Sequence, residues 1–228
     1  MGAIRRRAVL VGLLLLAVTF GLGCNMLSLP FFLLQPEPKE KAALQQVAAK
    51  DKEQEVTVVI LVSGAPETRP ELLRADRDLS FRVAKHLQEL CKANDENVKV
   101  VSPSKVEAFK NEHPGWRTMD MDELARRFAA DYVINVEIES LSMYQKGSSN
   151  LLYRGDAQLS VTLVDASNPS VPSEAPLQII YPDESRGGAI PVDDEPPQKF
   201  KNDFFEKIAT QISWQFTAHP TSDSYRCE

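Results

Sequence analysis

Two stretches of the chain carry hydrophobic patterns that predict strands. Residues Val56–Val62 form an unbroken and largely β-branched apolar run, which is typical of a strand buried on both faces. Residues Leu151–Asp165 alternate instead, so we expect one face of this strand to pack and the other to meet water. The packed positions are Tyr153, Ala157, Leu159, Val161 and Leu163, and the wet positions are Arg154, Asp156, Gln158, Ser160 and Thr162.

Helical spacing of apolar residues marks other segments. These predicted helices cover Arg69–Ala93, Ser104–Glu112, Met119–Ala130 and Gln198–Thr217. Pro103 suits the first position of the second helix. Asp120 suits the N-cap of the third, with Glu123 placed three residues later as in a capping box. The apolar stripe of the last helix is Phe204, Ile208, Ile212 and Phe216.

Three further strands complete the predicted order. They cover Asn97–Val101, Tyr132–Met143, where Val136 and Ile138 oppose Glu137 and Glu139, and Pro176–Tyr181. A loop at Gly147–Asn150 makes a hairpin of the two longest strands. The order βαβααβββα predicts an α/β fold with a single mixed sheet of about five strands and helices packed mainly on one face.

The remaining segments set the expected domain boundaries. Residues 1–23 are expected to be a signal peptide, 24–54 a lipid-anchored tether, 55–217 the α/β domain and 218–228 a disordered tail. Within the tether, Lys39–Gln54 is rich in Ala, Lys, Glu and Gln, which favours a partly helical, solvated spacer. Asp183–Pro197 is acidic and rich in Pro and Gly, so we expect a mobile excursion there.

The amino terminus indicates where the protein works. Arg5–Arg7 precede the apolar run Ala8–Phe20, and Gly21-Leu22-Gly23-Cys24 follows. This layout resembles a bacterial lipoprotein signal, which implies that the thiol of Cys24 is acylated and that the body of the chain lies in the cell envelope, facing the periplasm. Because Met26–Leu34 is apolar again, an uncleaved membrane span over Ala8–Leu34 is an alternative, and simple secretion is another.

Charge and cysteine content narrow the class of protein. The formal net charge is −6, and no block of Lys and Arg follows Arg5–Arg7, which argues against a nucleic-acid partner. The 3 cysteines are too few for a disulfide framework, and Cys91 lies at a helical apolar position, so we expect a buried thiol. The histidines, His86, His113 and His219, lack metal-ligand spacing.

Candidate chemistry along the chain is sparse. Ser63-Gly64 ends the first strand, where α/β proteins often bind ligands, but no glycine-rich phosphate loop or Gly-x-Ser-x-Gly motif accompanies it. Asp183-Glu184 with Asp193-Asp194-Glu195 is a candidate calcium cluster, although loop solvation explains it better. His86 is expected at the surface or boundary, and Trp214 half-buried against the sheet. Trp116 either packs in the core edge, which we favour, or forms an exposed contact. We expect no cofactor and no catalytic site.

Two short sequence motifs resemble those of a known family. Residues 123–134 run from a short helix through Ala130-Asp131-Tyr132-Val133 into a strand, and Leu163-Val164-Asp165-Ala166 ends the next strand. This pairing is similar to the amino-terminal domain of the Tol-system propeller protein, the penicillin-binding-protein activator lipoproteins and the curli-secretion lipoprotein. The apolar Met26–Leu34 segment also resembles uncharacterised lipoproteins of planctomycete-like bacteria. The resemblance implies docking to envelope proteins, and no family site residue carries over.

The sequence therefore predicts a non-catalytic envelope lipoprotein that binds or assembles with another protein. In this hypothesis acylated Cys24 holds the domain at membrane lipid, and the polar face of the Tyr132–Asp165 hairpin meets an envelope protein partner. The alternatives are an envelope hydrolase with an unrecognised site and a subunit of an oligomeric secretion assembly.

Overall fold

The computed structural model describes residues 39–49, 51–64, 70–183 and 188–221. In this part of the chain a six-stranded sheet has the strand order β3-β2-β4-β5-β6, and β7 pairs with β5 beside the end of β6. The strands are β2 (Val56–Gly64), β3 (Val98–Val100), β4 (Tyr132–Tyr144), β5 (Leu152–Asp165), β6 (Ser173–Tyr181) and β7 (Ile190–Pro191). β2 runs parallel to β3 and β4, whereas the other pairs are antiparallel.

The helices lie close to the predicted positions. They are α3 (Ala75–Ala93), α4 (Pro103–Glu112), α5 (Met121–Phe128) and α6 (Pro197–Ser213), with the short 3-10 turns η1 (Pro70–Leu72) and η2 (Trp116–Thr118). Pro103 occupies the start of α4 as predicted. Asp120 is the N-cap of α5, but its side chain makes no capping bond, and Glu123 pairs with Arg127 instead. The predicted capping box is therefore wrong.

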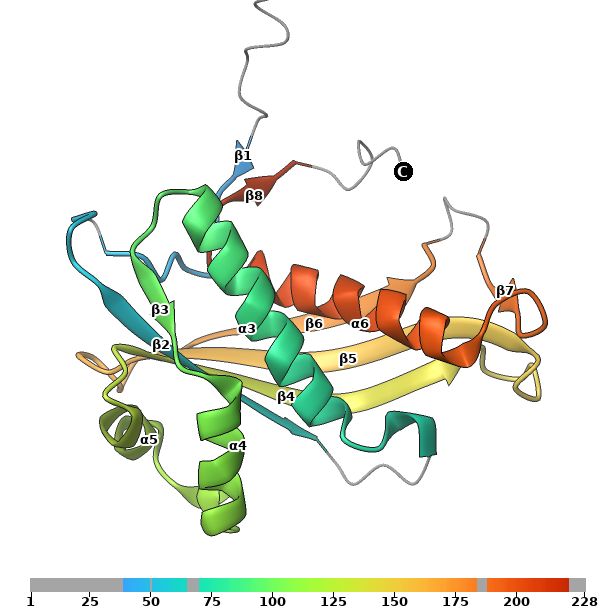
Figure 1. The fold of residues 1–228 in the computed structure, drawn as a ribbon, viewed down its shortest axis with the longest axis horizontal. Helices are drawn as coiled ribbons and strands as arrows, with labels where there is room; N and C mark the ends of the chain where they lie inside the picture. Colours follow the sequence, from blue (N-terminus) through green and yellow to red (C-terminus); the bar gives the residue numbers. More distant parts are fainter. Residues whose placement is uncertain (1–38, 50, 65–69, 184–187, 222–228) are drawn as a thin grey trace, which may run out of the picture. The chain divides into compact units, whose positions relative to one another are not determined.

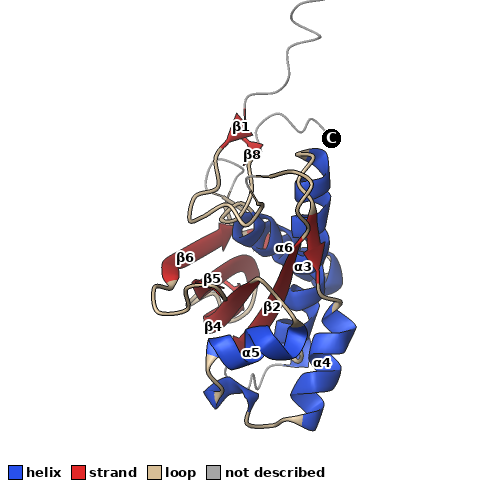
Figure 2. Ribbon diagram, turned by 90° about the vertical axis from the view of Figure 1, so that its left-hand side faces the viewer, coloured by secondary structure: helices blue, strands red, loops and turns tan. Residues whose placement is uncertain are grey.

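Both faces of β2 are buried, each by different helices. Val58, Ile60 and Val62 belong to the large core under α3 and α6, whereas Val59 and Leu61 pack in a second cluster with residues of α4 and α5. Figures 1 and 2 show α3 and α6 side by side over the sheet and α4 and α5 at the β2 end. The fold class is confirmed, with the refinement that α4 and α5 cover part of the second face.

The alternation predicted for β5 is confirmed, because its inward side chains are buried and its polar ones are at least partly exposed. β4 follows the same rule up to Ile138, where the register to β5 shifts between Ile138 and Ser140. This irregularity leaves both Glu139 and Ser140 exposed and brings Leu141 back to the core face.

The segment that we expected to be a solvated, partly helical spacer is packed instead. Described residues 39–49 and 51–54 contain no helix, and Val47 is fully buried. Backbone N–H groups of Ala43, Leu44, Gln45 and Val47 donate to carbonyls of residues 214–216. Those carbonyls follow the last turn of α6, where a helix leaves such groups without internal partners. The N–H groups of residues 43–45 and 47 therefore supply hydrogen-bond donors to the carbonyls that follow α6.

The carboxyl-terminal segment also begins with ordered pairing. Strand β1 (Lys39–Glu40) pairs with β8 (His219–Pro220), so the frayed tail expected from residue 218 on is wrong at these positions. His219 is buried, and its ring stacks on Trp214, with 4.4 Å between the centroids. Trp214 is half-buried as predicted.

The expected excursion Asp183–Pro197 is partly anchored, since Ile190 and Pro191 pair with β5. The third antiparallel strand begins at Ser173 and not at Pro176. Cys24, Glu184 and Cys227 lie outside the described residues, so the signal peptide, the acylation site and the boundary at residue 23 stay predictions. None of the helices in the described part of the chain has both the length and the apolar character needed to cross a bilayer.

Candidate functional site

Beyond the ends of β4 and β5 that pack against α4 and α5, one face of β4, β5 and β6 carries no helix among the described residues. We call this surface the open face. Its side chains are mostly polar and include Glu137, Gln158, Ser160, Thr162, Glu174, Gln178 and the exposed Ile180. The hydroxyl of Ser160 donates to the Glu174 carboxylate over 3.0 Å, a cross-strand contact that orders both side chains. The charged side chains on this face are Glu137, Asp156 and Glu174 against Arg154, so the open face carries a net negative charge.

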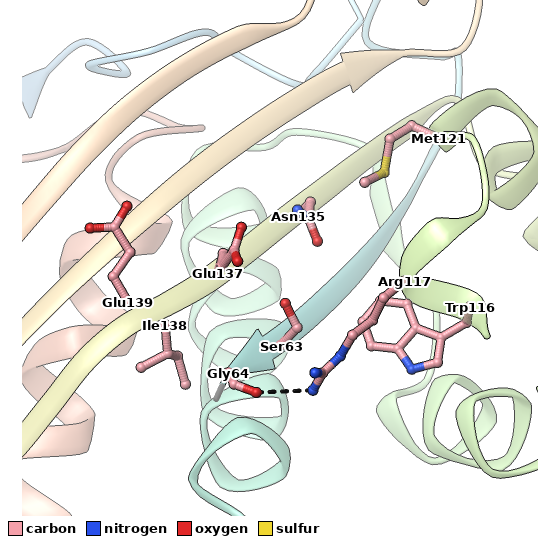
Figure 3. A pocket seen from close by; sticks show the side chains of 9 residues that line it. All are labelled: Ser63, Gly64, Trp116, Arg117, Met121, Asn135, Glu137, Ile138 and Glu139. Atoms are coloured by element: carbon pink, nitrogen blue, oxygen red, sulfur yellow. Dashed lines mark hydrogen bonds between the residues drawn. The ribbon is translucent and has the colours of Figure 1, made fainter. Parts of the chain in front are cut away.

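A pocket of about 330 Å³ lies where the open face meets the carboxyl end of β2. Ser63 and Gly64 come from β2, Trp116 and Arg117 from η2, Met121 from α5, and the remaining side chains from β4 (Figure 3). In the parallel register Ser63 lies beside Glu137, and Gly64 lies beside Ile138. We call this cavity the switch-point pocket.

The name follows from the connections of the strands. The chain leaves β2 through α3 to reach β3 on one side, and then returns through α4 and α5 to β4 on the other side. The two connections lie on opposite faces of the sheet. Open α/β sheets bind ligands outside the carboxyl ends of their strands at such a topological switch point.

Two basic side chains donate hydrogen bonds to backbone carbonyls on the exposed edge of β2. Strand β3 pairs only with residues 56–58, so the later carbonyls on that edge need other donors. Lys110 Nζ donates to the carbonyl of Val62 over 2.8 Å, and Arg117 Nη2 donates to that of Gly64 over 3.0 Å. Both cations also lie near the indole of Trp116, at 5.0 Å and 5.8 Å from its centroid.

The opposite side of the pocket carries two carboxylates. Glu137 and Glu139 are exposed, and among the described residues neither has a hydrogen-bond or ion-pair partner. Lys110, whose side chain is only 8% exposed, pairs with Glu107 and not with these residues. On one side of the switch-point pocket, Arg117 is bound to a backbone carbonyl of β2. On the other side are two carboxylates without an ion-pair partner among the described residues.

A second cavity of about 650 Å³ lies at the far end of the β4–β5 hairpin. Its lining includes Tyr144, Lys146, Arg154 and Asp156. Asp156 keeps one carboxylate oxygen without a partner among the described residues. This second cavity lies by the loop of the hairpin, whereas the switch-point pocket lies beside the middle of β4.

The structure separates the other predicted candidates. Ser63 and Trp116 meet in the switch-point pocket, and Trp116 is buried as expected. His86 lies between α3 and α6, where it and Arg82 pair with Glu206. Burial alone would raise the pKa of Glu206, but the hydrogen bond from His86 and the charge of Arg82 outweigh this effect and lower it.

The acidic residues considered for calcium have different partners. Glu195 pairs with Lys199, while Asp193 and Asp194 are exposed. Within the described residues, no group of three His, Cys, Asp or Glu side chains is arranged to hold a metal ion. Burial and the nearby Glu96 charge raise the pKa of the Cys91 thiol to about 12, which makes it a poor nucleophile.

Sequence reasoning missed Arg117 and Glu137 as members of one site. They lie in different elements, and Arg117 stands in a short turn without a motif. The signal that could have found the site was Ser63-Gly64 at the end of the first strand. The order of the strands in the sheet determines which residues lie beside that position.

Comparison with protein-family models and with curated proteins gives no match. Several solved structures are similar to this chain. The PelC dodecamer from Paraburkholderia phytofirmans has 13% identity and a TM-score of 0.43, over 79% of this chain and 99% of that one. The hypothetical protein CT253 from Chlamydia trachomatis has 19% identity and a TM-score of 0.41, over 70% and 96%. The lipoprotein GNA1162 from Neisseria meningitidis has 13% identity and a TM-score of 0.37, over 56% and 85%. Likenesses at this level assign no function.

Proposed function

We propose that this protein is a membrane-tethered envelope lipoprotein that acts as a non-catalytic binding or assembly module, with the open face as its docking surface. The observation that carries the proposal is the open face itself. The same three strands bury their other face under α3 and α6, so this polar surface is held rigid from behind.

Charge indicates the kind of partner. Glu137, Glu139 and Glu174 project from exposed positions of the open face or its border, and the whole chain has a net charge of −6. Such a surface attracts a basic patch on another protein and repels acidic ones. We therefore expect an envelope protein that presents a positively charged surface. The resemblance of residues 123–134 and 163–166 to envelope docking domains agrees with this choice.

The docking test uses a photo-crosslinking amino acid placed at Gln178 of the open face, with Gln88 on α3 as the control position. Both side chains are exposed. In the native envelope, a discrete adduct is expected from position 178 and not from position 88. Adding Glu137→Lys and Glu174→Lys is expected to reduce the adduct about tenfold, because the charge match is reversed. Glu89→Lys on α3 is the matched control. Equal adducts at both positions, or an adduct that survives the charge reversal, would contradict the proposal.

The anchor is tested separately by metabolic labelling with a palmitate analogue. We expect the wild-type protein to carry the label, Cys24→Ala to lose it, and Cys227→Ala to keep it, because acylation requires the cysteine that follows the signal. Label retained by Cys24→Ala would exclude the proposed anchor and favour a different attachment.

A further inference from the structure

We infer that the switch-point pocket takes the cationic side chain, lysine or arginine, of an extended segment of the protein partner. This inference rests on the proposed function and names the chemistry of one contact within it. The pocket and its charges come from η2, α5, the carboxyl end of β2 and the middle of β4, and of the positions changed in the docking test above it contains Glu137 alone.

The position of the pocket gives room for such a segment. β2 ends at Gly64, whereas β4 continues to Tyr144. Beyond Ile138, β4 therefore has no strand partner on its β2 side among the described residues. The cavity formed at this step has a volume of about 330 Å³, at the lower end of the range for ligand pockets and suited to one long side chain.

The charges select a cation. The donors Lys110 and Arg117 are directed to backbone carbonyls of β2, and Lys110 is also paired with Glu107. Glu107 neutralises Lys110, whereas Arg117 keeps its positive charge, so Arg117, Glu137 and Glu139 together give the pocket lining a net charge of −1. The two glutamates have no ionic partner among the described residues. Two carboxylates therefore face one guanidinium, and this excess of negative charge repels an anionic ligand and attracts a cation.

The lining also suits the stem of a basic side chain. Met121, Ile138 and Trp116 supply apolar surface, with Met121 and Trp116 on the side of the pocket away from the two carboxylates (Figure 3). Lys and Arg side chains bury their methylene groups along such surface while the charged group reaches polar partners. A metal ion fits less well, since the described residues offer no set of three ligating side chains.

The inference is tested with two blocked tripeptides, Ala-Arg-Ala and the same peptide with citrulline, the neutral analogue of arginine. Full-length protein in non-ionic detergent carries ¹³C-labelled methyl groups on Met and Ile. We expect the arginine peptide to cause saturable NMR shifts at Met121 and Ile138, and the citrulline peptide to bind roughly tenfold more weakly. The signal of the buried Met143 reports whether the fold is intact.

Variants assign the contact to the two glutamates. Glu137→Gln with Glu139→Gln is expected to weaken binding of the arginine peptide roughly tenfold, whereas Glu89→Gln on α3 leaves it unchanged. Equal binding of both peptides, full binding by the double variant, or shifts confined to methyl groups outside the pocket would each overturn the inference.

Failure of this inference can be told apart from failure of the proposed function. Without peptide binding, a charge-sensitive adduct from position 178 leaves the docking proposal standing and removes only the pocket contact. With specific peptide binding, equal adducts from positions 178 and 88 remove the open face as the docking surface.

Discussion

At the scale of single residues, Gly155 shows how closely α6 packs on the sheet. A Cβ atom built at this position would lie 2.6 Å from Phe204 Cδ2, which is much closer than real contacts allow. Phe204 is fully buried, and the Phe200 ring beside it stacks on Tyr153 at 4.7 Å between centroids. The Phe204 ring therefore has little room to move. Position 155 requires glycine because there is no space for a Cβ atom.

We accordingly predict that Gly155→Ala lowers the free energy of unfolding by about 1–3 kcal/mol, through overpacking of the core. Urea denaturation of the full-length protein in detergent measures the loss. Gly115→Ala is the matched control, because a Cβ atom there meets nothing within 4 Å. Equal stability of the two variants would mean that α6 does not press on β5 as described.

Residue patterns account for much of the fold but for little of the site. Alternation in β5 identified its buried side chains, and the apolar run at Val56–Val62 identified the strand that is covered on both faces. The site escaped because Arg117 and Glu137 meet only through the strand order. Val47 escaped because its burial depends on backbone bonds to residues after α6, which leave no periodicity in the sequence.

At the scale of elements, the segment 39–49 is part of the domain and not a spacer. Val47→Ala tests this, since removing two buried methyl groups is expected to cost about 2 kcal/mol of unfolding free energy. In a solvated spacer the same change would have almost no effect. Lys41→Ala, at an exposed position, is expected to stay within about 0.5 kcal/mol of wild type. Urea denaturation again provides the measurement, and equal values for both variants would contradict the packing.

The contact between α3 and α6 adds a pH dependence. The pKa of Glu206 is lowered from its ordinary value of 4.5, so its pairing stabilises the folded state above that value. This stabilisation is lost as the pH falls through the lower pKa of the folded state, when the carboxylate gains a proton.

We predict that between about pH 5 and pH 3 the unfolding free energy of wild type falls more steeply than that of Glu206→Gln, which has no carboxylate to protonate. Denaturation curves across this range measure the two slopes. Glu89→Gln, at an exposed position of α3, is expected to follow wild type. Parallel curves for wild type and Glu206→Gln would show that the pair with His86 and Arg82 adds nothing.

At the scale of the whole molecule, the edges of the sheet decide how it meets other chains. β3 has only three residues, which makes one edge short. β6 has nine residues and is the longer edge, and among the described residues it pairs only with β5. The pairing runs unbroken through Ser160 and Pro176. The Pro176 nitrogen therefore points outward, and the exposed edge lacks a donor at its centre.

This arrangement favours recognition through the open face over strand addition at the edge. We predict that Pro176→Thr, which restores the outward N–H and favours extended backbone, produces larger species than wild type as concentration rises. Sedimentation velocity of both proteins in the same detergent measures the change. Gln178→Thr is the control, because it lies on the same edge and face and already has its N–H. If Gln178→Thr associates as strongly, threonine on this face drives the association and the missing donor at position 176 does not protect the edge.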